Sequence, residues 1–189
     1  MRKAVILHGI TDKEEYFEMD FPSLSNAHWS PWLQQKFLRA GVFCQTLEMP
    51  TPYAPVYEEW VETFEQLSLN DDSIVVGHSA GCGFILKWLH HNRNRHFKKV
   101  VLVAPYLDPE KEQGDFLQLD LDPSIQDQIN EIHLLSSSND MNSIQQTTEK
   151  VIKIYPKIKL HQFNDMGHFD FEYTGPTFPD LWEIAKPKE

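Results

Sequence analysis

The chain has 189 residues, of which 41% are hydrophobic and 12% aromatic, so it can bury a substantial core in one globular domain spanning residues 1–189. Its formal charge of -11 makes the surface repel phosphate groups, which argues against binding to nucleic acids and to anionic membranes. No apolar run approaches the roughly 18 residues of a membrane span, and the run after Lys3 is too short for a signal peptide. Two cysteines, Cys44 and Cys82, make neither a disulfide framework nor a zinc site, so we expect a cytoplasmic protein with reduced thiols.

Short apolar runs alternate with amphipathic stretches along the whole chain. Such runs are typical of buried strands in a parallel sheet, and the amphipathic stretches carry apolar residues at helical spacing. In chain order we expect strand 3–7, helix 30–40, strand 42–47, helix 56–67, strand 73–76, helix 80–90, strand 99–103, short helix 123–130, strand 131–135, helix 143–153, strand 158–163 and helix 179–185. This alternation predicts an α/β fold, a mostly parallel sheet of about six strands with helices on both faces.

The segments between these elements carry their own signals. Ser30 and Pro31 are expected to open the first helix, with the serine as its N-cap and the proline at the first helical position. Residues 49–55 contain three prolines, which remove backbone donors and predict a rigid loop at a strand end. Residues 11–29 are aromatic and acidic without clear periodicity, and Phe21 and its aromatic neighbours are expected to be mainly core and loop anchors.

Three of the chain's 8 glycines lie close together around one serine. They are Gly77, Gly81 and Gly83, and Ser79 stands between the first two, after an expected strand and before an expected helix. Glycine loses the most backbone freedom on folding, so such a cluster indicates a tight turn or a close approach of two backbones. A strand, a strained turn and a helix can together expose a serine as a nucleophile. In that motif, side chains at positions 77 and 81 would collide with the neighbouring backbone. The pattern predicts that Ser79 is this nucleophile.

A serine hydroxyl is a weak nucleophile and needs a base, usually a histidine that a carboxylate holds in the right tautomer. The strand at 131–135 runs into a polar segment that contains Asp140, and the strand at 158–163 runs into one that contains His168. Because the carboxyl ends of parallel strands meet at one edge of the sheet, we expect His168 as the base and Asp140 as its orienting carboxylate. Asp165 is an alternative, although it lies only three residues before His168.

The remaining parts of the expected site are two backbone donors and a pocket. The helix after Ser79 points the amide of Ala80 toward a developing oxyanion, and the amide of Ile10, with room left by Gly9, is the candidate second donor. About 27 residues separate the fourth and fifth expected strands, too few for a large lid over the site. The candidate pocket residues are His8, His78, Trp29, Tyr53, Tyr106 and Phe116. The spacing of the other histidines predicts neither a metal site nor a bound cofactor.

The stretches GHSAG, SSSND and MGHF together resemble the α/β-hydrolase superfamily, and within it the small, lidless serine hydrolases similar to retinoblastoma-binding protein nine. The resemblance implies a single α/β-hydrolase domain with Ser79 as nucleophile, His168 as base and Asp140 as its orienter. It also implies hydrolysis of a small acyl ester or amide without a cofactor. That relative binds its protein partner through a Leu-x-Cys-x-Glu motif. This chain lacks the motif, so the resemblance implies no protein partner.

Other functions remain open alongside a carboxylesterase with an acyl-enzyme intermediate. The same fold could carry an idle triad in a binding or interaction protein, because a fold does not dictate a function. The same chemistry could also act on amide, peptide or thioester bonds. Turnover of short esters and its loss without His168 would separate these alternatives.

Overall fold

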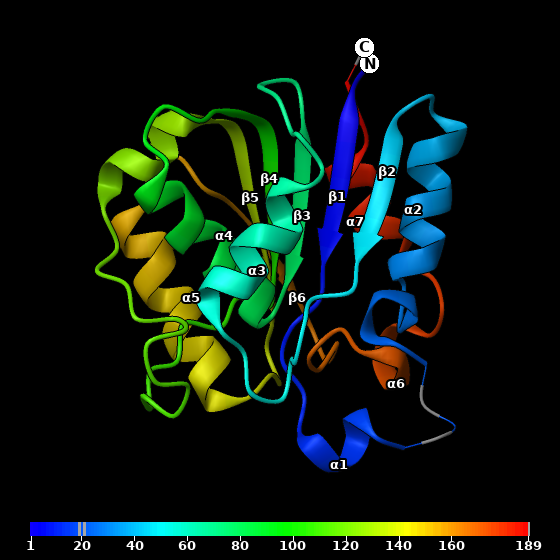
Figure 1. Ribbon diagram of the computed structural model, residues 1–189, viewed down its shortest axis with the longest axis vertical. Helices are drawn as coiled ribbons and strands as arrows, with labels where there is room; N and C mark the ends of the chain where they lie inside the picture. The colour runs from blue at the N-terminus through cyan, green and yellow to red at the C-terminus, as the bar shows by residue number, and fades with distance from the viewer. Residues whose placement is uncertain (19, 21, 189) are drawn as a thin grey trace.

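The computed structural model describes residues 1–18, 20 and 22–188, so Phe21 lies outside the described residues (Figure 1). One sheet of six strands runs through the protein in the order β2-β1-β3-β4-β5-β6, and every neighbouring pair is parallel. The strands are β1 (Lys3–Leu7), β2 (Phe43–Leu47), β3 (Ile74–His78), β4 (Phe97–Val103), β5 (Ile129–Ser137) and β6 (Lys159–Phe163). This arrangement confirms the α/β fold class.

Helices cover both faces of the sheet (Figure 1). The α-helices are α1 (Lys13–Tyr16), α2 (Ser30–Arg39), α3 (Tyr57–Glu65), α4 (Ala80–His91), α5 (Asn142–Ile154), α6 (Phe171–Thr174) and α7 (Pro179–Ala185). Two 3-10 helices, η1 (Leu24–Asn26) and η2 (Pro123–Gln128), lie between them. The helices α3, α4 and α5 pack on one face, whereas α2 and α7 pack on the other.

The two faces have separate hydrophobic cores because successive strand residues point in opposite directions. Val75 belongs to the core under α3 and α4, together with Trp60 and Trp88, while the next residue, Val76, belongs to the core under α2 and α7. All four side chains are at most 1% exposed. Full burial of an apolar side chain of this kind contributes about 1.5–3 kcal/mol, so both layers stabilise the central strands.

Several element boundaries differ from those expected. Trp29, not Ser30, is the N-cap of α2, because its carbonyl accepts the first bond of the helix from the Leu33 amide (2.9 Å). Strand β3 continues to His78, which pairs with Val103 of β4, so the strand ends two residues later than expected and Ser79 is the first residue after it.

Three short helices were not expected from the sequence. Helices α1 and α6 have 4 residues each and η1 has 3, too few to show a helical repeat. Asp12 caps α1 by accepting from the Glu15 amide, and Asp170 caps α6 by accepting from the Glu172 amide. Each cap satisfies a backbone donor that the helix itself leaves free.

The register of the sheet gathers three loops at its carboxyl edge. His78 at the end of β3 pairs with Val103, and Ser137 at the end of β5 pairs with Phe163 at the end of β6. The residues that follow these strands, including Ser79, therefore leave the sheet at the same edge, which is where α/β proteins place their ligands.

Candidate active site

Ser79 stands at a sharp turn between β3 and α4. Its backbone angles are φ 53° and ψ -123°, a conformation that residues other than glycine adopt at a cost of about 1–3 kcal/mol. Three backbone hydrogen bonds hold it there: its amide donates to the Val103 carbonyl (2.9 Å), and its carbonyl accepts from the amides of Cys82 (3.0 Å) and Tyr106 (3.1 Å). The strained turn is thus fixed by β4, by α4 and by the loop after β4.

Glycines surround this turn because backbones approach one another too closely for a side chain. A Cβ atom at Gly81 would lie 2.5 Å from the carbonyl oxygen of His8, and one at Gly77 would lie 2.9 Å from a backbone nitrogen of α4. A Cβ atom at Gly9 would lie 2.8 Å from Cβ of Ser79, so the loop after β1 passes directly beside the serine. The collisions expected at positions 77 and 81 are confirmed.

His168 lies against Asp140 across two loops. Its Nδ1 is 3.0 Å from Oδ1 and 3.2 Å from Oδ2 of Asp140, whose side chain is only 1% exposed. Since the carboxylate can only accept when ionised, it holds the proton on Nδ1 and leaves Nε2 of His168 free to act as an acceptor. The side chain of Asp165 is exposed instead, and the structure places Asp140 rather than Asp165 at the histidine ring.

Two cavities bring Ser79 and His168 together, and Ile10 lines both of them. The first, which we call the histidine cavity, has a volume of about 220 Å³ and is also lined by His8, His28 and His78. The second, which we call the tyrosine cavity, has a volume of about 520 Å³ and is also lined by Tyr106, Glu110 and Met141. Among the described residues no hydrogen bond joins Ser79 Oγ to His168 Nε2, a contact that often tightens only when substrate binds.

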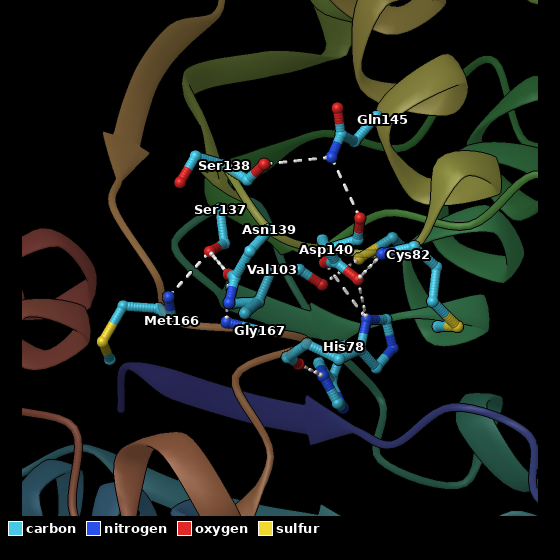
Figure 2. A network of polar contacts seen from close by, with 12 residues as sticks. His78, Cys82, Val103, Ser137, Ser138, Asn139, Asp140, Gln145, Met166 and Gly167 are labelled. Carbon is cyan, nitrogen blue, oxygen red and sulfur yellow. Dashed lines mark hydrogen bonds and ion pairs between the residues drawn. The ribbon is translucent and has the colours of Figure 1, made fainter.

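Residues at the end of β5 and just after it hold the loop that carries His168 (Figure 2). Oγ of Ser137 accepts from the Met166 amide (2.8 Å), and Oδ1 of Asn139 accepts from the Gly167 amide (2.8 Å). Ser137 also donates to Asn139 (2.8 Å), which orients the asparagine oxygen toward the loop. The polar residues that precede Asp140 therefore anchor the backbone that precedes His168.

Three ring side chains bind backbone groups of the same loop between His168 and Phe171. Nε2–H of His78 donates to the carbonyl of His168 (2.8 Å), and Nε1–H of Trp29 donates to the carbonyl of Phe169 (2.9 Å). Nδ1 of His28 accepts from the Phe171 amide (2.9 Å). Backbone groups on both sides of the His168 ring are thus satisfied by side chains, which fixes the loop without regular secondary structure.

The three other histidines near Ser79 are held as neutral rings. Burial lowers the pKa of His8 and of His28, and burial together with the neighbouring His168 and His28 lowers the pKa of His78 well below its usual 6.5. His8 accepts from the Met49 amide (2.8 Å) and donates to the Gly9 carbonyl (2.6 Å), so both of its nitrogens are engaged. His168 lines both cavities, and its Nδ1 pairs with Asp140, so Nε2 is the nitrogen of this ring that has no protein partner among the described residues.

The other pocket candidates differ in where they lie. Tyr106 lines the tyrosine cavity, and Tyr53 packs against Tyr16 beside α1 (5.0 Å between ring centroids). Trp29 and Phe116 are core residues with exposures of 1% and 3%, which corrects their placement in the pocket. An aromatic residue in a loop can either pack in the core or line a pocket, and the sequence does not distinguish these two roles.

Some residues of the site were not found from the sequence. Glu15 and Asp170 line the histidine cavity, and His28 lines it as well as binding the His168 loop. His28 has a positive φ (54°) and lies in the turn before the N-cap of α2, and no sequence pattern would have revealed this role.

The described part of the chain offers no cluster of three or more His, Cys, Asp or Glu side chains that could hold a metal ion. Within the same residues, none of the helices has the length and apolar character needed to traverse a bilayer.

Comparisons with known proteins agree with this architecture. A family model described as serine hydrolase matches residues 21–184. The protein YdeN of Bacillus subtilis (strain 168) is 34% identical over 97 residues, which cover 50% of this chain and 51% of YdeN, so the match spans about half of that relative.

Solved structures extend the likeness to nearly the whole chain. The crystal structure of the B. subtilis ydeN gene product matches with a TM-score of 0.82 at 24% identity, covering 97% of this chain and 96% of that chain. Est1E from Butyrivibrio proteoclasticus with bound ferulic acid matches with a TM-score of 0.65 at 14% identity, covering 98% of this chain and 87% of that chain. These likenesses confirm the expected α/β-hydrolase fold.

Proposed function

Because the chain belongs to the serine hydrolase family, we propose that it cleaves small acyl esters through an acyl-enzyme formed on Ser79. The observation that carries the proposal is the pairing of His168 with the buried Asp140 at 3.0 Å, beside two cavities that Ser79 and His168 share. A serine at a strained turn and a histidine in a fixed tautomer are what acyl transfer requires.

The first half of the reaction transfers the acyl group to the enzyme. Nε2 of His168 removes the proton from Oγ of Ser79 as the oxygen attacks the ester carbonyl, and Asp140 stabilises the imidazolium that forms. When the tetrahedral intermediate collapses, His168 gives this proton to the departing alkoxide. The alcohol leaves, and the acyl group remains esterified to Ser79.

The second half releases the acid and restores the enzyme. His168 now removes a proton from water, which attacks the acyl carbonyl, and then returns the proton to Oγ of Ser79. In both halves the negative oxygen needs donors, and we assign this role to the amides of Ala80 and Ile10. Ala80 is the first residue of α4, so its amide has no acceptor within the helix, and Ile10 lines both cavities next to Ser79.

Covalent labelling tests the assignment of the nucleophile. A fluorophosphonate probe should modify the wild-type protein at Ser79, and the Ser79→Ala variant should stay unlabelled while keeping its folded circular dichroism spectrum. Cys82 is a suitable internal control, because burial raises the pKa of its thiol and keeps it unreactive. Labelling of Ser79→Ala, or no labelling of the wild type, would refute the proposal.

Turnover tests the bond type. The purified protein should hydrolyse p-nitrophenyl acetate, and His168→Ala should abolish this activity. A panel of matched amides and thioesters with the same acyl group should react more slowly than the ester. Preferential cleavage of the amide would replace the esterase assignment by an amidase, and specific binding without any turnover would indicate an idle triad.

A further inference from the structure

A third and larger cavity lies next to the site. Its volume is about 760 Å³, and its walls come from the η1 to α2 segment and from the α6 to α7 region. The side chains that line it are mostly apolar and include Ala27, His28, Pro31, Trp32, Phe171 and Pro176. We call it the apolar cavity. Phe171 is 60% exposed there, so its ring is available to an apolar group that enters the cavity.

The apolar cavity adjoins the histidine cavity at one side chain. His28 lines both, and its ring is fixed between them because Nδ1 accepts from the Phe171 amide. Burial lowers the pKa of His28, so the ring is neutral at neutral pH and can lie against an apolar group without loss of a charge's hydration. The two cavities therefore meet at the neutral ring of His28, on the side of the histidine cavity that also holds Ser79.

The other two cavities are poorly suited to an apolar group. The histidine cavity has only about 220 Å³ and carries the carboxylates of Glu15 and Asp170. The tyrosine cavity carries those of Glu110 and Glu112. A long acyl or alkyl chain next to these carboxylates would cost them hydration, whereas the apolar cavity would remove the chain from water at no such cost.

We propose that the apolar cavity binds an extended apolar arm of the ester substrate, so that the preferred substrates carry a medium-length alkyl or aromatic group. The substrate preference rests on the proposed esterase activity, whereas binding of an apolar group to the cavity can be measured without any reaction. Each methylene that enters the cavity is removed from water, so the preference should grow with the length of the arm.

Filling the cavity from its edge provides the kinetic test. Gln35 is an exposed residue of α2 that lines the cavity. Gln35→Trp should place a ring into the cavity without touching Ser79, His168 or the loop that carries His168. We expect kcat/KM for p-nitrophenyl octanoate, or for octyl acetate if the arm is on the alcohol side, to fall by about tenfold or more. The value for p-nitrophenyl acetate should not change.

Two further variants make the result specific. Leu38→Trp adds a ring to an exposed position of the same helix that is not among the lining residues, and it should affect neither long ester. Trp32→Ala removes a wall of the cavity and should lower kcat/KM for the long ester several-fold while sparing the acetate. Equal effects of Gln35→Trp on long and short esters, or no effect on either long ester, would overturn the subsite and leave the esterase proposal standing.

A binding measurement separates this inference from the proposed activity. In the Ser79→Ala background, which cannot form a covalent adduct, calorimetry with methyl octyl ketone should show binding that Gln35→Trp weakens by about tenfold. If the wild type hydrolyses no ester, the esterase proposal fails and this titration still decides the subsite. Ketone binding that is unaffected by Gln35→Trp would exclude the apolar cavity.

Discussion

The turn at Ser79 and the loop that carries His168 are held in opposite ways. Ser79 is fixed by backbone hydrogen bonds and by glycines that let neighbouring backbones approach within contact distance. The His168 loop is fixed by side chains that reach it from three other parts of the chain, such as Asn139, His78 and Trp29.

This difference determines what each half of the site tolerates. A side chain added at the turn meets backbone that cannot move aside, so changes there should act on folding. A hydrogen bond removed around the loop leaves the tight turn at Ser79 intact, so changes there should act mainly on the position of one imidazole. Activity should therefore be more sensitive to changes at the loop, and stability to changes at the turn.

The largest expected effect is on the loop side, at the carboxylate that orients His168. Asp140→Asn should lower kcat for ester hydrolysis by about 10⁴-fold, because the amide no longer favours the tautomer with a proton on Nδ1. The unfolding transition should stay cooperative. Asp165→Asn is the matched control, since it changes an exposed carboxylate in the loop next to His168 and should leave kcat nearly unchanged. A large loss in Asp165→Asn with little loss in Asp140→Asn would point to Asp165 as the orienting residue.

The next largest effect is expected at the turn. Gly81→Ala should lower the free energy of unfolding by about 3 kcal/mol, because its Cβ would lie 2.5 Å from the His8 carbonyl oxygen. Gly114→Ala provides the comparison: nothing lies within 4 Å, and only its positive φ of 54° is unfavourable, at about 1 kcal/mol. Urea unfolding of both variants measures the difference. Equal losses would mean that the close approach at Gly81 is relieved at little cost.

A smaller effect should follow from removing one hydrogen bond to the loop. Trp29→Phe keeps an aromatic ring in the core but leaves the Phe169 carbonyl without its donor, which we expect to lower kcat by about tenfold and stability by about 1–2 kcal/mol. Trp88→Phe also removes a buried indole donor, its bond to Glu65 at 3.1 Å, on the opposite face of the sheet. It should cost similar stability with kcat unchanged. A parallel loss of kcat in both variants would reduce the role of Trp29 to general packing.

The same contrast explains how much the sequence predicts. The strand, the glycines, Ser79 and the helix after it are neighbours in the chain, so their pattern is visible in the sequence. Asp140 and His168 could be located because each follows a predicted strand. The bonds from Trp29 and His28 to the loop span 140 and 143 positions, and no local pattern encodes contacts of that kind. Trp29 was for that reason expected in the pocket, although its indole belongs to the core.

The smallest effect concerns pH and again arises on the loop side. The folded protein holds His78 neutral with a pKa well below 6.5, whereas the unfolded chain binds a proton at that position near 6.5. Stability from this group is therefore fully present above about pH 6.5 and is lost as the pH falls toward the folded pKa, by up to about 1.4 kcal/mol per pH unit.

In His78→Gln an amide N–H can still donate to the His168 carbonyl, but nothing titrates, so the free energy of unfolding should vary less steeply between about pH 5 and pH 6.5. Some slope should remain, because burial also lowers the pKa of His8 and His28. Urea unfolding across this range provides the measurement. An unchanged dependence of the unfolding free energy on pH would show that His78 binds protons equally in the folded and unfolded states. That result would contradict a buried, neutral His78 ring bound to the His168 loop.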